Sequence, residues 1–231
     1  MGKTLLIIPA YNEEGSLEAT VSSVMSEAPW VNYLVVNDGS KDGTAAVCRR
    51  NNYPFLDLPV NLGLAGAFQA GMKYAYRHHY DCAIQFDADG QHLPEYIPLL
   101  EEAILDNDIA IGSRFVDKKK PSSMRMLGSN LIEVAIKLTT GKTIKDPTSG
   151  MRAFNARMIE QMAKGLNFGP EPDTVSYLIK RADAKVVEVP VEMAERTAGE
   201  SYLNLGNSIK YMLRMTISIL FMQVIRKRIG R

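Results

Sequence analysis

Cysteine is scarce in this chain, and its scarcity excludes two classes of protein. The 231 residues include two cysteines, Cys48 and Cys82, which lie far apart and within apolar stretches. Two cysteines without metal-ligand spacing are compatible neither with a disulfide framework nor with a cysteine-based zinc site. We therefore expect two reduced, buried thiols in a cytosolic protein.

An excess of charge of either sign is also absent. Lys and Arg total 27 and Asp and Glu total 26, so the formal net charge is +1. Proteins that bind nucleic acid usually carry a strong positive field, and this composition does not produce one. We expect no nucleic-acid partner. Basic character is local, in residues 118–120 and 226–228 and in Arg231.

Long uncharged apolar runs are missing as well. A helix that crosses a bilayer needs about 20 apolar residues. The nearest candidate, residues 209–225, is interrupted by Lys210 and Arg214. The N-terminus enters an apolar run at Thr4 without the charged and apolar regions of a signal peptide. We expect a cytoplasmic protein whose last apolar segment is a core or interfacial helix.

The chain does contain a regular alternation of short apolar runs with helical patterns. The runs predict strands at 4–9, 33–38, 55–58, 82–87 and 108–113, and the patterns predict helices at 14–27, 44–51, 65–78 and 95–105. Fully apolar strands that alternate with helices indicate a mostly parallel α/β sheet covered on both faces. Polar or glycine-bearing residues follow the strands, and open α/β sheets bind ligands at the carboxyl ends of their strands.

The alternation breaks after Ser113. The patterns there predict helices at 127–138, 157–162 and 174–181, strands at 151–154 and 185–191, and a final helix. No repeat, low-complexity tract or linker divides the chain, so we expect one α/β domain followed by a terminal helix.

The strongest local signal for chemistry is the segment DADGQH at residues 87–92. Asp87 and Asp89 follow an apolar strand, and Gly90 permits a turn that brings both carboxylates to one point. Mg²⁺ and Mn²⁺ prefer such oxygen ligands and take others from water and substrate phosphates. A surface turn that caps the next helix would have the same composition, so this segment alone leaves both interpretations open.

Seven segments in a fixed order give the chain a more specific signature. They are IPAYNEE (8–14), VVNDGSKDGT (35–44), NLGLAGAFQAG (61–71), DADGQHLPE (87–95), GSR (112–114), DPTSGMRAF (146–154) and RTAGES (196–201). In these segments the chain resembles the family 2 glycosyltransferases, and within them the dolichyl-phosphate mannosyltransferase-like, polyprenyl-phosphate group. The resemblance implies a GT-A fold, which is a Rossmann-like mixed sheet flanked by helices. It also implies transfer of a hexose from a nucleotide sugar to a polyprenyl phosphate.

The resemblance implies a nucleotide pocket near the first two strands. Pro9, Tyr11 and Glu13 match the loop that lines this pocket in the family, and Asp38 matches the aspartate that binds the base. Asn37 stands where many relatives have a second aspartate and is not assigned. The polar residues of 37–44 would also suit a plain turn and helix cap. The base and the sugar cannot be read from these residues; we expect UDP-glucose or UDP-N-acetylglucosamine ahead of GDP-mannose.

The resemblance also implies a metal and a set of residues around the donor diphosphate. Asp87, Asp89 and Gln91 match the motif that holds Mg²⁺ or Mn²⁺ together with the diphosphate. Arg196 and Ser201 belong to a C-terminal segment, with Gly199 between them, that closes over the diphosphate in the family. A guanidinium there would stabilise the leaving group. A solvated pair with a neighbouring glutamate is the alternative for Arg196.

Three residues match the family's site for the acceptor phosphate: Arg114, Arg125 and Ser129. The planar fork of arginine binds phosphate oxygens bidentately, and a serine hydroxyl donates one further hydrogen bond.

Asp146 matches the aspartate that orients or deprotonates the nucleophile in the family, although it would also suit a tight Asp-Pro turn. The second pKa of a phosphate monoester is about 6, so the acceptor is mostly dianionic at neutral pH. A general base, which contributes roughly 10²–10⁴-fold for a hydroxyl acceptor, then has little to add. We expect Asp146 to position the acceptor or the sugar. We also expect inversion by a single in-line displacement, since no carboxylate matches a covalent nucleophile.

The final segment predicts contact with a membrane surface. A mostly apolar set of residues recurs there at helical spacing: Ile209, Met212, Leu213, Thr216, Ile217, Leu220, Phe221 and Val224. A basic tail follows, and each Lys or Arg near an anionic leaflet contributes about 1 kcal/mol. We expect a catalytic domain at 1–205, with a nucleotide-sugar half (1–113) and an acceptor half (114–205), and a basic amphipathic helix at 206–231. This predicts peripheral attachment to the inner face of the membrane, with self-association or a small membrane protein as further partners.

Two other functions remain open from the sequence. A related glycosyltransferase that acts on a saccharide hydroxyl would need a true general base and would not need Arg114 and Arg125. A non-catalytic scaffold that binds nucleotide sugars would retain the fold but not the reaction.

Overall fold

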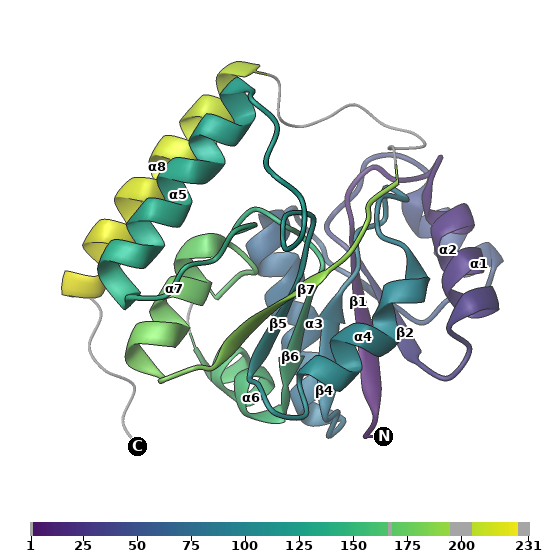
Figure 1. The fold of residues 1–231 in the computed structure, drawn as a ribbon. Coiled ribbons are helices and arrows are strands. Elements are labelled where there is room, and N and C mark those ends of the chain that lie inside the picture. Colours follow the sequence, from purple (N-terminus) through teal and green to yellow (C-terminus); the bar gives the residue numbers. More distant parts are fainter. Residues whose placement is uncertain (1, 166–167, 195–204, 226–231) are drawn as a thin grey trace.

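The central element of the fold is one sheet. The computed structural model describes residues 2–165, 168–194 and 205–225, and the side chains of 124–125, 205–209 and 222–225 lie outside that description. Within these residues seven strands form the sheet in the order β3-β2-β1-β4-β6-β5-β7 (Figure 1). The strands are β1 Thr4–Ala10, β2 Asn32–Asn37, β3 Phe55–Asp57, β4 Cys82–Gln85, β5 Ile109–Ser113, β6 Arg152–Asn155 and β7 Val186–Pro190.

One strand runs against the others. β6 pairs antiparallel with both β4 and β5, whereas the β1–β2, β1–β4, β2–β3 and β5–β7 pairs are parallel. The carboxyl ends of β1, β2, β4 and β5 therefore lie at one edge of the sheet. Because β6 is antiparallel, its first residue, Arg152, lies near that same edge.

Helices cover both faces of the sheet. They are α1 Leu17–Glu27, α2 Thr44–Arg50, α3 Gly63–Arg77, α4 Ile97–Ala103, α5 Met124–Thr140, α6 Ala156–Lys164, α7 Pro172–Arg181 and α8 Leu205–Ile225, with a short 3₁₀ turn, η1, at Pro94–Tyr96. Along β1, Leu5 and Ile7 pack into the core on the side of α3 and α6, and Leu6 and Ile8 pack into the core on the side of α1 and α4. Strands buried on both sides are the reason for the fully apolar runs, and the predicted mixed GT-A-type sheet is confirmed.

Close packing accounts for a glycine in α3. A Cβ at Gly71 would lie 2.4 Å from Cγ2 of Ile7 on β1, so the helix can approach the strand only without a side chain there. Cys48 and Cys82 are buried free thiols, as predicted, and burial raises the pKa of Cys48 to about 11.

Helices α5 and α8 lie side by side at one flank of the molecule, with α7 between them and the sheet (Figure 1). The amphipathic terminal helix was predicted, and its apolar residues divide into two sets. Met212, Met215 and Ile219 are buried, whereas Leu213, Ile217, Leu220 and Phe221 are exposed. None of the helices in the described part of the chain combines the length and the apolar character that a membrane crossing requires.

Candidate active site

The loops that follow β1 and β2 are tied to one another by side chains. The backbone N–H of Asn12 donates to Ser40 Oγ (3.0 Å), and Asn12 Oδ1 accepts from the N–H of Lys41 (2.9 Å). The N–H of Glu13 donates to Thr44 Oγ1 (2.9 Å). Asn12 has a φ of 57°, a left-handed conformation that asparagine tolerates better than most residues. The two segments expected to line a nucleotide pocket therefore form one rigid rim.

Asp38 is buried at the end of β2. Its Oδ1 accepts the backbone N–H of Leu62 (2.7 Å), which is the N-cap residue of α3. The side-chain amide of the neighbouring Asn37 does not share this contact with Leu62 and donates to Asp57 Oδ1 (2.7 Å). Asp38 thus anchors the start of α3, and its contact with a base stays a prediction.

The turn after β4 presents two carboxylates. Asp87 Oδ1 accepts from Gln85 Nε2 (2.8 Å), and Asp89 Oδ1 accepts from the N–H of Gln91 (3.0 Å). The left-handed turn falls at Gly90, with a φ of 78°. The Asp87 side chain is 34% exposed, whereas Asp89 is 6% exposed. One carboxylate therefore reaches solvent while the other braces the turn.

His92 lies beneath Asp87 and fixes its direction. The backbone N–H of Asp87 donates to His92 Nδ1 (2.9 Å), so the imidazole proton is on Nε2, which lies 3.6 Å from Asp87 Oδ2. A Cβ at Gly150 would lie 2.6 Å from the same Oδ2. The space beside Asp87 exists because residue 150 has no side chain.

This arrangement fits an open divalent-cation site. In the described ranges, 2–165, 168–194 and 205–225, no three His, Cys, Asp or Glu side chains are grouped so that they could hold a metal ion by themselves. Mg²⁺ and Mn²⁺ do not need one, because water and substrate phosphate oxygens complete their coordination. Asp87 and Asp89, with the space left by Gly150, are the residues that could hold such an ion.

Replacing Gly150 by alanine is expected to lower turnover and to weaken Mn²⁺ binding, because the new Cβ would displace Asp87 Oδ2. Gly2→Ala is a matched control, since its Cβ would also lie 2.6 Å from a carboxylate oxygen, Asp81 Oδ2, near the amino ends of β1 and β4. Manganese titration of both variants measures the difference. Equal Mn²⁺ affinity in the two variants would contradict this role of Gly150.

Arg114 and Asp146 form a partly buried, bidentate ion pair beyond the end of β5. Arg114 Nε donates to Asp146 Oδ2 (2.7 Å) and Nη2 donates to Oδ1 (2.8 Å), and the Arg114 backbone N–H adds a third bond to Oδ2 (3.1 Å). The Asp146 side chain is fully buried and that of Arg114 is 26% exposed. Nη1 of Arg114 has no hydrogen-bond partner among the described residues, so this end of the fork is available to a ligand.

The loop that carries Asp146 is held from two sides. Glu188 on β7 accepts the N–H groups of Lys145 and Asp146, each at 2.7 Å, and Ser149 Oγ donates to the carbonyl of Gly112 (2.5 Å). Arg152, the first residue of β6, donates to the carbonyls of Pro147 and Ser149. Asp146 is therefore the end of a braced segment rather than a mobile acid.

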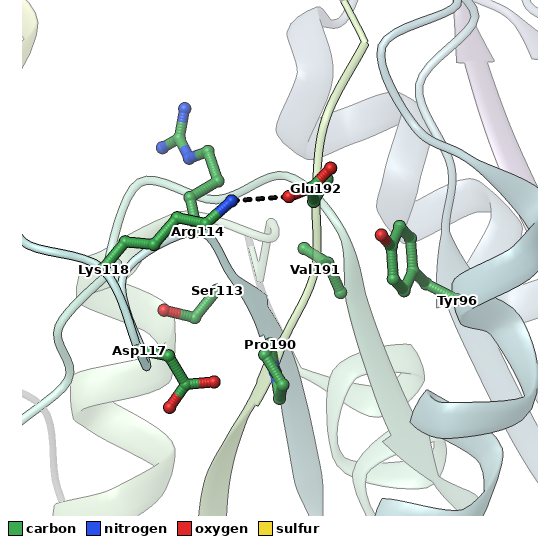
Figure 2. Close-up of a pocket in the computed structure, with 8 residues that line it drawn as sticks. All are labelled: Tyr96, Ser113, Arg114, Asp117, Lys118, Pro190, Val191 and Glu192. Atoms are coloured by element: carbon green, nitrogen blue, oxygen red, sulfur yellow. Dashed lines mark hydrogen bonds and ion pairs between the residues drawn. The ribbon is translucent and has the colours of Figure 1, made fainter.

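A small cavity of about 250 Å³ lies beside Arg114 (Figure 2). Its lining comes from the ends of β5 and β7 and from η1: Tyr96, Ser113, Arg114, Asp117, Lys118, Pro190, Val191 and Glu192. Figure 2 shows the ion pair of Lys118 Nζ with Glu192 Oε1 (2.5 Å) across this cavity. Arg114 thus has solvent-accessible space next to it.

The basic cluster at 118–120 is largely paired with carboxylates. Lys118 pairs with Glu192, and Lys120 pairs with Glu133 of α5 (2.7 Å), so two of the three lysines are offset by carboxylates. Lys120 also donates to Asn130 and thereby ties the loop to α5. The sequence shows the positive charges together but not the acidic partners that come from distant segments.

The structure describes only some of the other predicted site residues. Pro9, Tyr11 and Glu13 lie at the end of β1 and in the rim that follows it. Ser129 on α5 is fully buried, and its hydroxyl has no hydrogen-bond partner among the described residues. Arg196, Gly199 and Ser201 lie outside the described residues, as does the side chain of Arg125.

Sequence reasoning missed three residues that build this site: Gln85, Gly150 and Arg152. Their roles depend on groups that meet only in the fold. Gly150, inside the segment DPTSG, carried the only local signal, since a glycine beside a candidate aspartate suggests a close approach.

Comparison with known proteins identifies the family of this chain. The sequence profile described as "Glycosyl transferase family 2" matches residues 5–163, more than half of the chain. The undecaprenyl-phosphate mannosyltransferase of Micrococcus luteus is 34% identical over 219 residues, which is 88% of each chain. The polyprenol monophosphomannose synthase of Mycolicibacterium smegmatis is 31% identical over 229 residues, 92% of this chain and 85% of that one.

Among solved structures, glucosyl-3-phosphoglycerate synthase from Mycobacterium tuberculosis superposes with a TM-score of 0.70 at 16% identity. The match covers 96% of this chain and 80% of that one, and that crystal structure contains Mn²⁺ and uridine diphosphate. At this identity the likeness establishes the fold alone.

Proposed function

Because this chain belongs to glycosyl transferase family 2, we propose that it transfers a hexose from a nucleotide sugar to a polyprenyl phosphate, with inversion at the anomeric carbon. The chain is a glycosyltransferase; its acceptor and donor are the proposal. The two relatives named above are an undecaprenyl-phosphate mannosyltransferase and a polyprenol monophosphomannose synthase, and these names support both the lipid phosphate and a hexose.

The observation that carries the proposal is the Arg114–Asp146 pair. A guanidinium aligned by a buried carboxylate, with one nitrogen left for a ligand beside a cavity, suits a phosphate oxygen. A hydroxyl acceptor needs a base with an accessible lone pair. Both oxygens of Asp146 already accept hydrogen bonds from Arg114, so Asp146 is better suited to hold Arg114 than to remove a proton.

The unpartnered hydroxyl of Ser129 adds support. A buried hydroxyl without a hydrogen bond is costly, and a phosphate oxygen would satisfy it. We assign Arg125 to the same phosphate through its position four residues before Ser129, one helical turn away on α5.

On the donor side, we propose that Pro9, Tyr11, Glu13 and Asp38 line the nucleotide pocket. Asp87, Asp89 and Gln91 would hold a divalent cation and the diphosphate. Mg²⁺ or Mn²⁺ held there would supply positive charge to offset the charge of the diphosphate. The chain's own contribution is orientation: Gln85 and His92 fix Asp87, and the turn at Gly90 fixes Asp89. Arg196 and Ser201, outside the described residues, would close over the diphosphate.

The α5–α8 pair is proposed as the surface that meets the membrane. Its exposed apolar side chains form one set at helical spacing: Leu127, Leu131, Val134 and Leu138 on α5, and Leu213, Ile217, Leu220 and Phe221 on α8. Lys137, Lys210 and Arg214 are exposed on the same two helices. Apolar side chains next to cations suit the interface of an anionic bilayer. In this proposal residues 1–113 bind the donor, 114–205 bind the acceptor, and 206–231 attach the enzyme to the inner face.

Replacing Leu131, Leu138, Leu213 and Phe221 by glutamine is expected to reduce sedimentation with vesicles that contain anionic lipid, because four exposed apolar contacts are lost. Leu105→Gln is a suitable control, since Leu105 is 73% exposed at the end of α4, as Leu138 is 76% exposed on α5. If the fourfold variant binds vesicles as the parent protein does, the α5–α8 pair is not the membrane surface.

A transfer assay tests the proposed function. The protein is mixed with Mn²⁺, polyprenyl phosphate in detergent, and one radiolabelled donor at a time: GDP-mannose, UDP-glucose or UDP-N-acetylglucosamine. We expect label in the organic phase with one donor. Transfer to a saccharide hydroxyl but not to the lipid phosphate would contradict the proposal.

A further inference from the structure

The interior of the sheet contains a charged side chain that no part of the proposed reaction uses. Arg152 is the first residue of β6, lies between β4 and β5, and is 1% exposed. Its guanidinium donates three hydrogen bonds: Nε to the carbonyl of Ser149 (2.9 Å), Nη2 to that of Pro147 (2.6 Å), and Nη1 to that of Pro170.

A buried guanidinium usually has a carboxylate partner, because the cost of removing a charge from water is high. Arg152 forms no ion pair within the described part of the chain, and three carbonyl dipoles take that place. Burial lowers the pKa of Arg152, whereas Tyr211, Glu171, Asp146 and Asp87 act in the opposite direction. Two of these groups, Asp146 and Asp87, belong to the acceptor and donor sides of the candidate site.

The three carbonyls belong to two separate segments. Pro147 and Ser149 follow Asp146 directly, and Pro170 lies just before α7. Helix α7 in turn receives a hydrogen bond from α8, since Ser218 Oγ donates to Asp173 Oδ2 (2.6 Å). Arg152 thus joins the loop that carries Asp146 to the helices behind it.

We propose that Arg152 is a positioning residue for the acceptor phosphate. Its side chain holds the 146–150 loop against the segment before α7, and Asp146 can therefore hold Arg114 in the direction that binds the phosphate. This inference rests on the proposed function, because it names what the acceptor side of the site depends on. Arg152 itself contacts no substrate in this scheme. Its effect passes through Pro147, Ser149 and Asp146 to the Arg114 fork.

The register of the sheet gives this clamp a counterpart on the donor side. Gln85 of β4 lies opposite Arg152 in the antiparallel pair, and its amide holds Asp87. This one pair of facing residues therefore supports both sides of the site: Gln85 holds the candidate metal-binding turn, and Arg152 holds the acceptor loop. Loss of Arg152 should displace Pro147 and Ser149 first, whereas Gln85 would still hold Asp87 through its own hydrogen bond.

Arg152→Lys tests the clamp, because lysine keeps the charge but cannot reproduce three hydrogen bonds in fork geometry. A displacement of the acceptor loop by about 1 Å would lower kcat by about 10²-fold. We expect that loss together with a raised KM for polyprenyl phosphate and an unchanged KM for the nucleotide sugar. Rates are normalised to the amount of protein that binds the donor's nucleoside diphosphate, which corrects for unfolded enzyme.

Arg157→Lys is the matched control. Arg157 also makes three hydrogen bonds through its guanidinium, two to Asp108 and one to the carbonyl of Ala182, near the amino end of β5. Its loss should destabilise the protein without changing either KM. If Arg152→Lys behaves like Arg157→Lys after normalisation, Arg152 is a structural residue and the inference fails.

Arg152→Met extends the test. We expect a larger loss of kcat than with lysine. Unfolding temperatures of this variant and of Arg157→Lys separate an effect on loop position from an effect on global stability. A parent enzyme that transfers no sugar to polyprenyl phosphate would instead overturn the proposed function. A parent enzyme that does so, with an Arg152→Lys variant that matches it in kcat and in acceptor KM, would overturn the clamp alone.

Discussion

Replacing Asp89 by alanine is expected to reduce transfer by about 10³-fold or more, since the charge stabilisation a catalytic metal supplies amounts to several kcal/mol. Asp89 also braces its own turn through the N–H of Gln91, so the change removes a candidate ligand and the shape of the turn together. Initial rates measured against Mn²⁺ concentration would show the loss.

Asp106→Ala provides a control at an exposed aspartate beyond α4, and it should retain the parent's dependence on metal. Asp89→Asn separates charge from shape, because the amide oxygen can still accept from Gln91. If Asp89→Ala keeps full metal-dependent turnover, the turn after β4 does not hold the catalytic metal.

Breaking the Arg114–Asp146 pair is expected to have the second large effect. Truncation of one partner of a buried, hydrogen-bonded charge pair costs about 2–5 kcal/mol in binding systems, which corresponds to roughly 30- to 4000-fold. We expect Arg114→Gln and Asp146→Asn each to lower kcat/KM for polyprenyl phosphate into this range. The double variant should be little worse than either single variant, because the two residues act as one unit.

The same pair of variants distinguishes the acceptor classes. If Asp146 were a general base for a saccharide hydroxyl, Asp146→Asn would lower kcat alone and Arg114→Gln would have a much smaller effect. In the phosphate account, Arg114→Gln is at least as damaging as Asp146→Asn. Steady-state kinetics with varied acceptor, at fixed donor and Mn²⁺, separate the two outcomes.

Much of the fold follows from local patterns in the sequence. The alternating burial of Leu5, Leu6, Ile7 and Ile8 on the two faces of β1 explains why an apolar run without polar positions predicted a sheet covered on both sides. Turn chemistry also was readable, since Gly90 adopts the left-handed conformation that the DADG segment requires.

The parts that could not be predicted depend on contacts between distant segments. Arg114 and Asp146 are 32 residues apart, and each could be identified alone but not as a pair. Arg152 sits in a strand that the sequence does indicate, yet a charged residue in a short strand would be expected at the surface. Only the carbonyls of Pro147, Ser149 and Pro170, brought together by the fold, allow it to be buried.

The charge pattern illustrates the same limit. Residues 118–120 appear in the sequence as a basic cluster, and the fold supplies Glu192 and Glu133 as partners for two of the three lysines. The exposed apolar residues of α5 and α8, rather than this loop, are then the main support for a membrane surface.

Mass spectrometry of the lipid product tests the central claim most directly. The protein, Mn²⁺ and the active nucleotide sugar are incubated with polyprenyl phosphate or with the corresponding polyprenol, which lacks the phosphate. The account predicts a product with the mass of polyprenyl phosphate plus one hexose unit, and no product from the polyprenol. A glycosylated polyprenol, or release of nucleoside diphosphate without any glycolipid, would contradict it.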